Sequence, residues 1–151
     1  MIRTFKKADS ERCSEIMRAC IEMMEEYEPK LNRLIYASWT AQMIAKKACE
    51  FERLLVYEQD AEVLGLGAFD EGRIEVMYVD PLHHHEGIGG TLLNALERYA
   101  KTKGLKKLEA RSSFLAEDFY REHGYETIDK GFSELGEFVV VWIKMEKTLG
   151  G

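Results

Sequence analysis

The sequence predicts a single α+β domain, built on a mixed, largely antiparallel central sheet with helices on both faces. Three observations support this fold class. A chain of 151 residues suits one domain with one hydrophobic core, and we treat residues 1–151 as that domain. Three strand-like segments follow one another with turns too short for a helical crossover. Helix-like and strand-like segments then alternate, so the expected order of elements is βααβββαβαββ.

The first third of the chain should form one strand and two helices. The strand is expected over residues 2–7. Asp9 and Ser10 can cap the next helix, whose apolar residues recur at helical spacing and which should end at Pro29. A second helix is expected over residues 38–49, beginning at its capping serine.

The rest of the chain should supply the other strands and helices. Two short turn signals, Gln59-Asp60-Ala61 and Asp70-Glu71-Gly72, separate three strands and predict an antiparallel meander. A strong helix follows a glycine-rich loop and should stop at Gly104. The expected elements are strands at 51–58, 63–69 and 73–79, helix 88–103, strand 107–112, helix 116–123, and closing strands 125–129 and 138–146.

Composition restricts the partners and the compartment. The net charge of -6 argues against nucleic acid as the main partner. No apolar run is long enough to span a bilayer, and no apolar stretch follows the first basic residues, so we expect a cytoplasmic protein without membrane contact. Basic side chains gather between residues 101 and 111. They form either a solvated helix end or a rim that attracts a phosphorylated cofactor.

The cysteines and histidines do not predict a metal site. Cys13, Cys20 and Cys49 are odd in number and lack metal-ligand spacing, so we expect buried free thiols. Three histidines stand side by side at residues 83–85. Adjacent residues cannot easily converge on one ion in tetrahedral geometry, so no bound metal is expected.

The loop between the third meander strand and the next helix predicts an anion site. Pro81 prevents the strand from continuing. Gly87, Gly89 and Gly90 lack a Cβ, so the backbone can bring successive N–H groups close to a bound group. The first N–H groups of a helix have no intrahelical partners, and the helix dipole favours negative charge there. Together these features suit a pyrophosphate.

Two other phosphate-binding loops match less well. A P-loop requires a Lys after its last glycine, and here Thr91 follows Gly90 directly. A dinucleotide fingerprint would need its third glycine at Leu92 and would normally open the domain. Glu109 does lie about one strand further on, where a ribose-binding acid could stand, so a nicotinamide cofactor stays a minor alternative.

Two motifs in this part of the chain resemble those of a known family. Val79-x-Pro81, Gly87-x-Gly89 and Leu92-Leu93 are similar to the acetyl-CoA loop of the GNAT N-acetyltransferases. Ala116-x-x-Phe119-Tyr120-x-x-x-Gly124-Tyr125 is similar to that family's second signature. The resemblance covers nearly the whole chain and implies the acyl-CoA N-acyltransferase fold. It also implies direct transfer of an acetyl group from acetyl-CoA to a primary amine of an unidentified small molecule or peptide.

The resemblance further implies which residues hold the cofactor. The backbone at residues 77–79 would contact the pantetheine arm and thioester, and residues 85–90 would wrap the pyrophosphate. Ser113 stands where many members have a cofactor-contacting Asn. His84 replaces the family's usual Gln or Arg, but its imidazole can still donate a hydrogen bond. The cofactor-binding residues so assigned are Met77, Tyr78, Val79, His84, His85, Glu86, Gly87, Ile88, Gly89, Gly90 and Ser113.

The same resemblance suggests an acid and a base. Tyr120 would protonate the leaving thiolate, although its spacing alone suits a core aromatic. Glu75 lies in an otherwise apolar strand and would accept the ammonium proton through water, a role favoured by burial. It could instead pair with Arg73 or a lysine. Glu109 is the second candidate, and members of the family can also work without a dedicated base.

Some questions stay open at this stage. A non-catalytic sensor that binds acyl-CoA is the alternative to an enzyme, favoured mildly by His84 and opposed by Tyr120. The acceptor pocket should be walled by the first two helices, with Tyr27, Tyr36 and Trp39, and by the hairpin at residues 133–137. No spacing among them names an acceptor, and the oligomeric state is open, a homodimer included.

Overall fold

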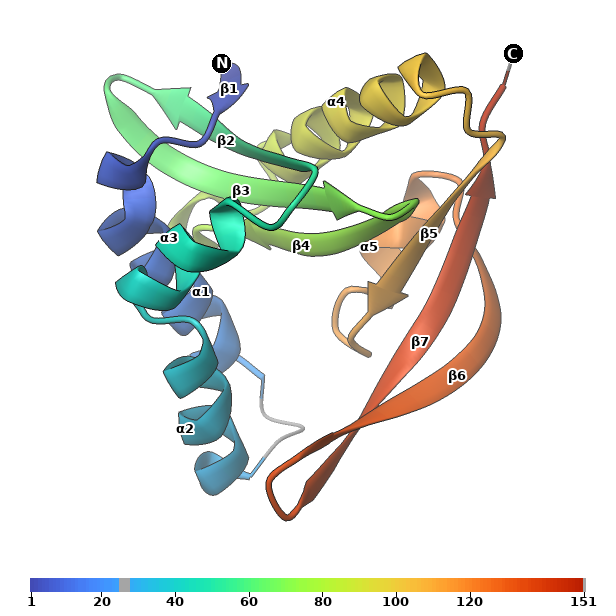
Figure 1. The fold of residues 1–151 in the computed structure, drawn as a ribbon. Helices are drawn as coiled ribbons and strands as arrows, with labels where there is room; N and C mark the ends of the chain where they lie inside the picture. Colours follow the sequence, from blue (N-terminus) through green and yellow to red (C-terminus); the bar gives the residue numbers. More distant parts are fainter. Residues whose placement is uncertain (25–27, 151) are drawn as a thin grey trace.

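The computed structural model describes residues 1–24 and 28–150 (Figure 1). Short 3₁₀ turns cover Lys7–Asp9 and Pro81–His83. The helices and strands are β1 (Ile2–Thr4), α1 (Ser10–Glu22), α2 (Pro29–Ser38), α3 (Ala41–Ala48), β2 (Arg53–Gln59), β3 (Glu62–Asp70), β4 (Arg73–Val79), α4 (Ile88–Thr102), β5 (Lys107–Ser112), α5 (Glu117–Glu122), β6 (Glu126–Leu135) and β7 (Phe138–Thr148).

The strands form one seven-stranded sheet in the order β1-β2-β3-β4-β5-β7-β6 (Figure 1). All neighbouring strands are antiparallel except β4 and β5. That parallel pair is joined only where Arg73 lies opposite Glu109 and Ile74 opposite Ala110. Beyond these residues the two strands diverge, and the loop after β4 lies at the open end (Figure 1). The expected mixed, largely antiparallel sheet is confirmed.

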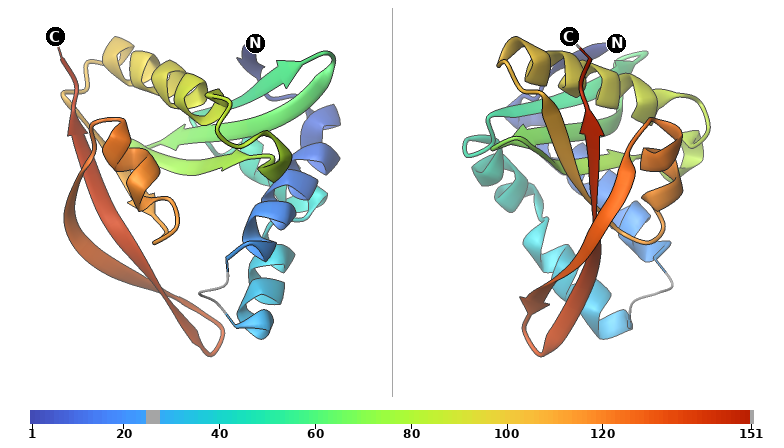
Figure 2. Two further views of the ribbon diagram at one scale, coloured as in Figure 1. Left: turned by 180° about the vertical axis from the view of Figure 1, so that it is seen from behind. Right: turned by 90° about the vertical axis from the view of Figure 1, so that its right-hand side faces the viewer.

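Helices cover both faces of the sheet (Figure 2). On one face α1 and α3 bury Ile16, Met17 and Ile44 against the meander strands. On the other face α4 and α5 bury a second cluster, in which Leu92 and Leu96 are fully inaccessible to solvent. Each such side chain stabilises the fold by roughly 1.5–3 kcal/mol, so the second cluster fixes the position of α4 and of the loop that precedes it.

The helices of the first third differ from the prediction. Pro29 begins α2 instead of ending the preceding helix, which has already stopped at Glu22. A proline is well suited to the first helical position because the N–H there needs no intrahelical partner. Ser38 is the last residue of α2, and Thr40 caps α3 by accepting from the Met43 N–H at 3.3 Å. Among the described residues between β1 and β2, the structure therefore has one more helix than expected.

The observed strand bounds differ from the expected ones at both ends of the chain. The first strand stops at Thr4, because the following residues turn into the 3₁₀ segment that leads to α1. The closing strands instead run on to a two-residue turn, Gly136-Glu137. Most of β6 is exposed to solvent, so its sequence lacks the apolar pattern by which a strand is recognised.

Two of the three cysteines are buried as expected. Cys13 and Cys20 lie on the buried side of α1, and burial raises the pKa of each thiol to about 12. The prediction was wrong for Cys49, which follows the last turn of α3 and is exposed. Within the described residues, none of the helices is both long and apolar enough to cross a membrane.

Candidate active site

The loop after β4 is fixed at its start by Asp80. The Asp80 carboxylate is buried, accepts from the Leu82 N–H at 3.0 Å and pairs with the Arg12 guanidinium of α1. Burial alone would raise the pKa of Asp80, but the Leu82 N–H and Arg12 outweigh it and lower that pKa. Arg12 also donates from Nε to the Val63 carbonyl at 2.9 Å. The entry of the loop is therefore held to both α1 and β3.

The end of the loop presents the start of α4. His85 and Gly87 adopt left-handed backbone conformations, with φ of 65° and 83°. Gly87 is the N-cap and supplies no side chain to cap the helix. The Thr91 N–H donates to the Gly87 carbonyl at 3.0 Å. The N–H groups of the preceding helical residues, from Ile88 on, lack intrahelical acceptors, as at any helix start, and could donate to a bound anion.

Two of the loop's three glycines have a packing reason that the sequence did not reveal. A Cβ on Gly89 would lie 2.9 Å from Cε1 of Phe119, and one on Gly90 would lie 2.8 Å from Nε2 of His123. Both neighbours belong to the α5 segment, so α4 and α5 can approach closely only with glycine at these positions. At Gly87 a Cβ would meet nothing within 4 Å, and the left-handed backbone explains that glycine.

His84 is not directed toward the start of α4. Its Nε2 lies 2.8 Å from the Val79 carbonyl oxygen, to which the Cys20 thiol also donates at 3.0 Å. The side chain expected to bind phosphate thus contacts a backbone group expected to bind the pantetheine arm. Cys20 was not among the predicted site residues, and its position 59 residues earlier on α1 left no sequence signal for this contact.

The other two histidines have separate surroundings. His83 contacts the Glu86 carboxylate at 3.2 Å, whereas His85 has the left-handed backbone of the loop. Within the residues that the structure describes, no group of three or more His, Cys, Asp or Glu side chains could hold a metal ion.

Tyr120 is buried on α5 among aromatic rings. Its ring lies 5.2 Å from that of Phe119 and 5.4 Å from that of Tyr125, measured between centroids. Burial, and then the nearby Tyr78, raise the pKa of Tyr120 above the usual value for a phenol. The hydroxyl therefore stays protonated at neutral pH. That protonation state is the one required of an acid.

Glu75 is the extra residue of a β-bulge in β4. The register places Phe69 opposite Ile74 but Ala68 opposite Val76, which leaves Glu75 between them without a partner on β3. As a result Ile74 packs on the α4 face and Val76 on the α1 face, although residues two apart normally share a face. Bulges of this kind often lie next to active sites, where they re-aim side chains.

Glu75 makes the ion pair with Arg73 that the sequence left open as an alternative, and its side chain is only partly buried. Its side chain is 27% exposed and accepts from Nε of Arg73 at 2.7 Å. Arg73 also lies 3.7 Å from Glu109, and Glu109 lies 3.3 Å from the Lys144 ammonium. The two candidate bases therefore belong to one charged network, in which Arg73 joins them.

Ser113 lies at the entry to α5. Its Oγ accepts from the Ala116 N–H at 3.3 Å, and its carbonyl accepts from the Ser112 hydroxyl at 2.7 Å. The serine thus shapes the turn between β5 and α5. Its hydroxyl hydrogen is not used in that contact, so the side chain keeps one donor for a ligand.

The basic cluster at residues 101–111 lies far from the anion site. Its lysines lie in the last turn of α4 and beyond it, and a helix of 15 residues is about 22 Å long at 1.5 Å per residue. Lys103 pairs with Glu52 at 3.7 Å and Lys107 with Glu146 at 3.3 Å. These ion pairs fit a solvated helix end and strand start, and the alternative of a rim that attracts a phosphorylated cofactor stays a prediction.

The expected walls of the acceptor pocket are partly brought together. A Cβ on Gly136 would lie 3.4 Å from Leu34, so the tip of the β6–β7 hairpin reaches α2. The Arg18 guanidinium carbon lies 5.8 Å from the centroid of the Tyr36 ring on α2. The Lys47 Nζ lies 4.5 Å from the centroid of the Trp39 ring. Tyr27 lies outside the described residues.

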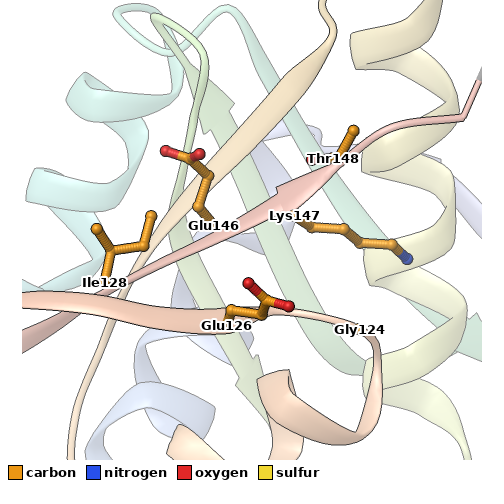
Figure 3. Close-up of a pocket in the computed structure, with 6 residues that line it drawn as sticks. All are labelled: Gly124, Glu126, Ile128, Glu146, Lys147 and Thr148. Atoms are coloured by element: carbon orange, nitrogen blue, oxygen red, sulfur yellow. The ribbon is translucent and has the colours of Figure 1, made fainter.

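A shallow cavity of about 230 Å³ lies elsewhere, on the outer surface of β6 and β7 (Figure 3). The Lys147 side chain at its edge extends toward α4, where its Nζ lies 3.0 Å from the buried Glu97. Glu97 also accepts from the Tyr125 hydroxyl at 2.8 Å, so this contact locks α4 to the hairpin. The cavity is lined by Gly124, Glu126, Ile128, Glu146, Lys147 and Thr148.

Comparison with known proteins identifies the family. The family model described as "Acetyltransferase (GNAT) domain" matches residues 22–149. The chain belongs to the GNAT acetyltransferase family. A relative from Bacillus subtilis (strain 168), the "Uncharacterized N-acetyltransferase YjcF", is 30% identical over 92 residues, which are 58% of this chain. The aligned region spans 65% of that relative, just under two thirds of its length.

Solved structures of GNAT proteins share the fold along nearly the whole chain. A GCN5-related N-acetyltransferase from Rhodopseudomonas palustris superposes with a TM-score of 0.91 at 21% identity, covering 99% of this chain and 95% of that one. The PaiA N-acetyltransferase of Thermoplasma acidophilum, crystallised with coenzyme A, gives 0.80 at 19% identity, covering 98% of both chains. The fold class and the GNAT family expected from the two motifs are confirmed.

Proposed function

We propose that this GNAT protein is a cytoplasmic enzyme that transfers the acetyl group of acetyl-CoA directly to a primary amine of a small molecule or peptide. The main support is the first turn of α4. Its N–H groups lack intrahelical acceptors, follow the left-handed Gly87 and lie at the open end between β4 and β5. A pyrophosphate would accept from these groups, and the positive end of the helix dipole would favour its charge.

The rest of coenzyme A would extend from this anion site toward β4. Backbone groups of Met77, Tyr78 and Val79 would contact the pantetheine arm and the thioester. Because His84 and Cys20 already donate to the Val79 carbonyl, a ligand that uses this oxygen must displace at least one of them. His84 is the exposed one of the two, so its side chain can turn away most easily.

The chemistry then requires two proton movements. The amine nitrogen attacks the thioester carbonyl carbon, a C–N bond forms and the C–S bond breaks. Tyr120, whose hydroxyl is protonated at neutral pH, would give its proton to the leaving thiolate. Glu75 would receive the amine's proton through water, and Glu109 is the second candidate because Arg73 connects the two carboxylates.

The test measures cofactor binding and turnover separately. Purified protein is titrated with coenzyme A by calorimetry and then incubated with acetyl-CoA and a panel of polyamines, amino acids, aminoglycosides and peptide N-termini. Release of free thiol together with the acetylated amine, detected by mass spectrometry, supports the proposal. Tight binding without thiol release from any amine would instead indicate an acyl-CoA sensor, and absence of binding would contradict both functions.

A further inference from the structure

The far half of the β6–β7 hairpin projects from the sheet as a two-stranded arm (Figure 1). β7 pairs with β5 only from Ile143 to Thr148, and β6 is the last strand of the sheet. Within the described part of the chain, residues 138–142 therefore pair with β6 alone. A two-stranded ribbon is marginally stable in water on its own, so this arm would gain from a partner.

One face of this arm is apolar and open to solvent. Phe132 is 66% exposed and Val139 is 58% exposed. Phe132 lies opposite Val141, and Glu134 lies opposite Val139, so these side chains share one face. Contiguous exposed apolar side chains beside an open strand edge are typical of a protein interface.

The free edge of β6 extends over residues 130–134. The Lys130 N–H donates to the Asp129 carboxylate at 2.8 Å, so it points away from β7. Inward and outward main-chain groups alternate along an antiparallel strand, which places those of Phe132 and Glu134 on the same outer edge. The start of β6 is covered by α5, where Thr127 donates to Glu117 at 2.8 Å.

We propose that this edge binds a second copy of the chain, with the two β6 strands antiparallel and Phe132 opposite the partner's Phe132. In this register Lys130 lies opposite the partner's Glu134, and the two-fold symmetry repeats that pair. The residues whose main-chain groups face outward then lie opposite one another, as an antiparallel ladder requires, and the Lys130 N–H exchanges the Asp129 carboxylate for the carbonyl of the partner's Glu134. A register with Lys130 opposite itself would bring like charges together, which is unfavourable. The dimer joins two seven-stranded sheets through an apolar centre flanked by two ion pairs.

The first test exchanges the paired charges. The wild-type chain should sediment at twice its mass of 17.4 kDa. Lys130→Glu or Glu134→Lys should each weaken self-association by roughly tenfold, since two attractive pairs become repulsive. An equimolar mixture of the two variants should dimerise again, because each copy then carries the charges that the other lacks. Glu137→Lys, in the turn outside the register, is the matched control and should leave the dimer intact.

The second test is a cross-link at the two-fold axis. Directly opposed residues of a hydrogen-bonded pair have Cα atoms about 5.5 Å apart, within the range of a disulfide. In a Cys49→Ser background, Phe132→Cys should therefore give an oxidised covalent dimer. Ile128→Cys should not, because its copies would lie roughly 27 Å apart at 3.4 Å per residue. Circular dichroism verifies that each variant folds.

Three results would overturn the proposal. If the wild-type chain stays monomeric at every concentration, self-association is excluded, and the β6 edge would then bind a different protein. A dimer indifferent to both charge changes places the interface elsewhere. Cross-linking at residue 128 but not at 132 shows a different register.

Discussion

Replacing Gly89 with alanine separates the two reasons for a glycine at the start of α4. The new Cβ would lie 2.9 Å from Cε1 and 3.1 Å from Cζ of Phe119, whereas carbon atoms prefer 3.5–4.0 Å. Such overpacking typically costs about 1–3 kcal/mol. Replacing glycine inside a helix returns at most about 1 kcal/mol. The free protein should therefore lose up to about 2 kcal/mol of unfolding free energy, a fall in Tm of up to about 8 °C for a chain of this size.

The sign of this change decides between the explanations. If Gly89 were needed only to admit a pyrophosphate, the unliganded Gly89→Ala protein would melt at or above the wild-type temperature and lose only its response to coenzyme A. Differential scanning calorimetry without ligand tests this directly. Removal of the opposing ring with Phe119→Ala should cancel the cost, so the double variant should be no less stable than Phe119→Ala alone. Gly104 has a left-handed backbone, and a Cβ there would meet nothing within 4 Å. Gly104→Ala therefore shows the effect of backbone strain alone, away from the site.

Three further predictions concern the site. Tyr120→Phe removes only a hydroxyl, so coenzyme A should bind as before while turnover falls by roughly 10²-fold in steady-state assays; unchanged turnover would make the tyrosine a packing residue. Glu75→Gln cannot accept a proton, so its rate should fall on the acidic limb of the pH–rate profile and recover at high pH, where the amine is already free; a uniform loss at every pH would exclude a role as base. Asp80→Asn should lower the unfolding free energy at pH 7 by about 1–3 kcal/mol. Because folding lowers the pKa of Asp80, this stabilisation is present above its unfolded pKa of about 3.9 and lost as pH falls through the folded value. The melting temperatures of the wild-type and Asp80→Asn proteins should therefore converge in strong acid. A difference that stays constant with pH would show that the Asp80 charge does not cause the stabilisation.

The sequence identified the loop and the family because both depend on local signals. A proline, closely spaced glycines and a helix start lie within a dozen residues, and each has a local backbone consequence. The packing of Gly89 against Phe119 has no such signal, since it depends on how α4 and α5 approach in space. Pro29 is ambiguous in the sequence, because a proline can follow the end of one helix or begin the next. The packing of the surrounding chain determines that Pro29 begins α2.

Side-chain directions were the least predictable part of the site. His84 was assigned to the phosphates from its position in the motif, but its contact with Val79 depends on the path of the backbone through the 3₁₀ turn. In the sequence, Glu75 has the pattern of a polar residue in an ordinary strand. A bulge changes the register with the neighbouring strand but leaves that pattern unchanged. Long-range contacts of this kind set the surroundings of catalytic groups, and periodicity does not report them.

The network around Glu75 explains why one residue was hard to name as the base. Glu75 and Glu109 carry two negative charges, and Arg73 and Lys144 carry two positive ones, so the four groups together are neutral. On the proposed function, an amine that arrives as an ammonium ion adds a positive charge beside them. Loss of its proton to bulk water restores neutrality, whereas transfer to a carboxylate leaves that charge within the network. Within this neutral group, a base that passes the proton on through water leaves the charges balanced, whereas a base that keeps the proton does not. The charge balance of the group, more than the identity of one carboxylate, then determines how readily the acceptor becomes a free amine.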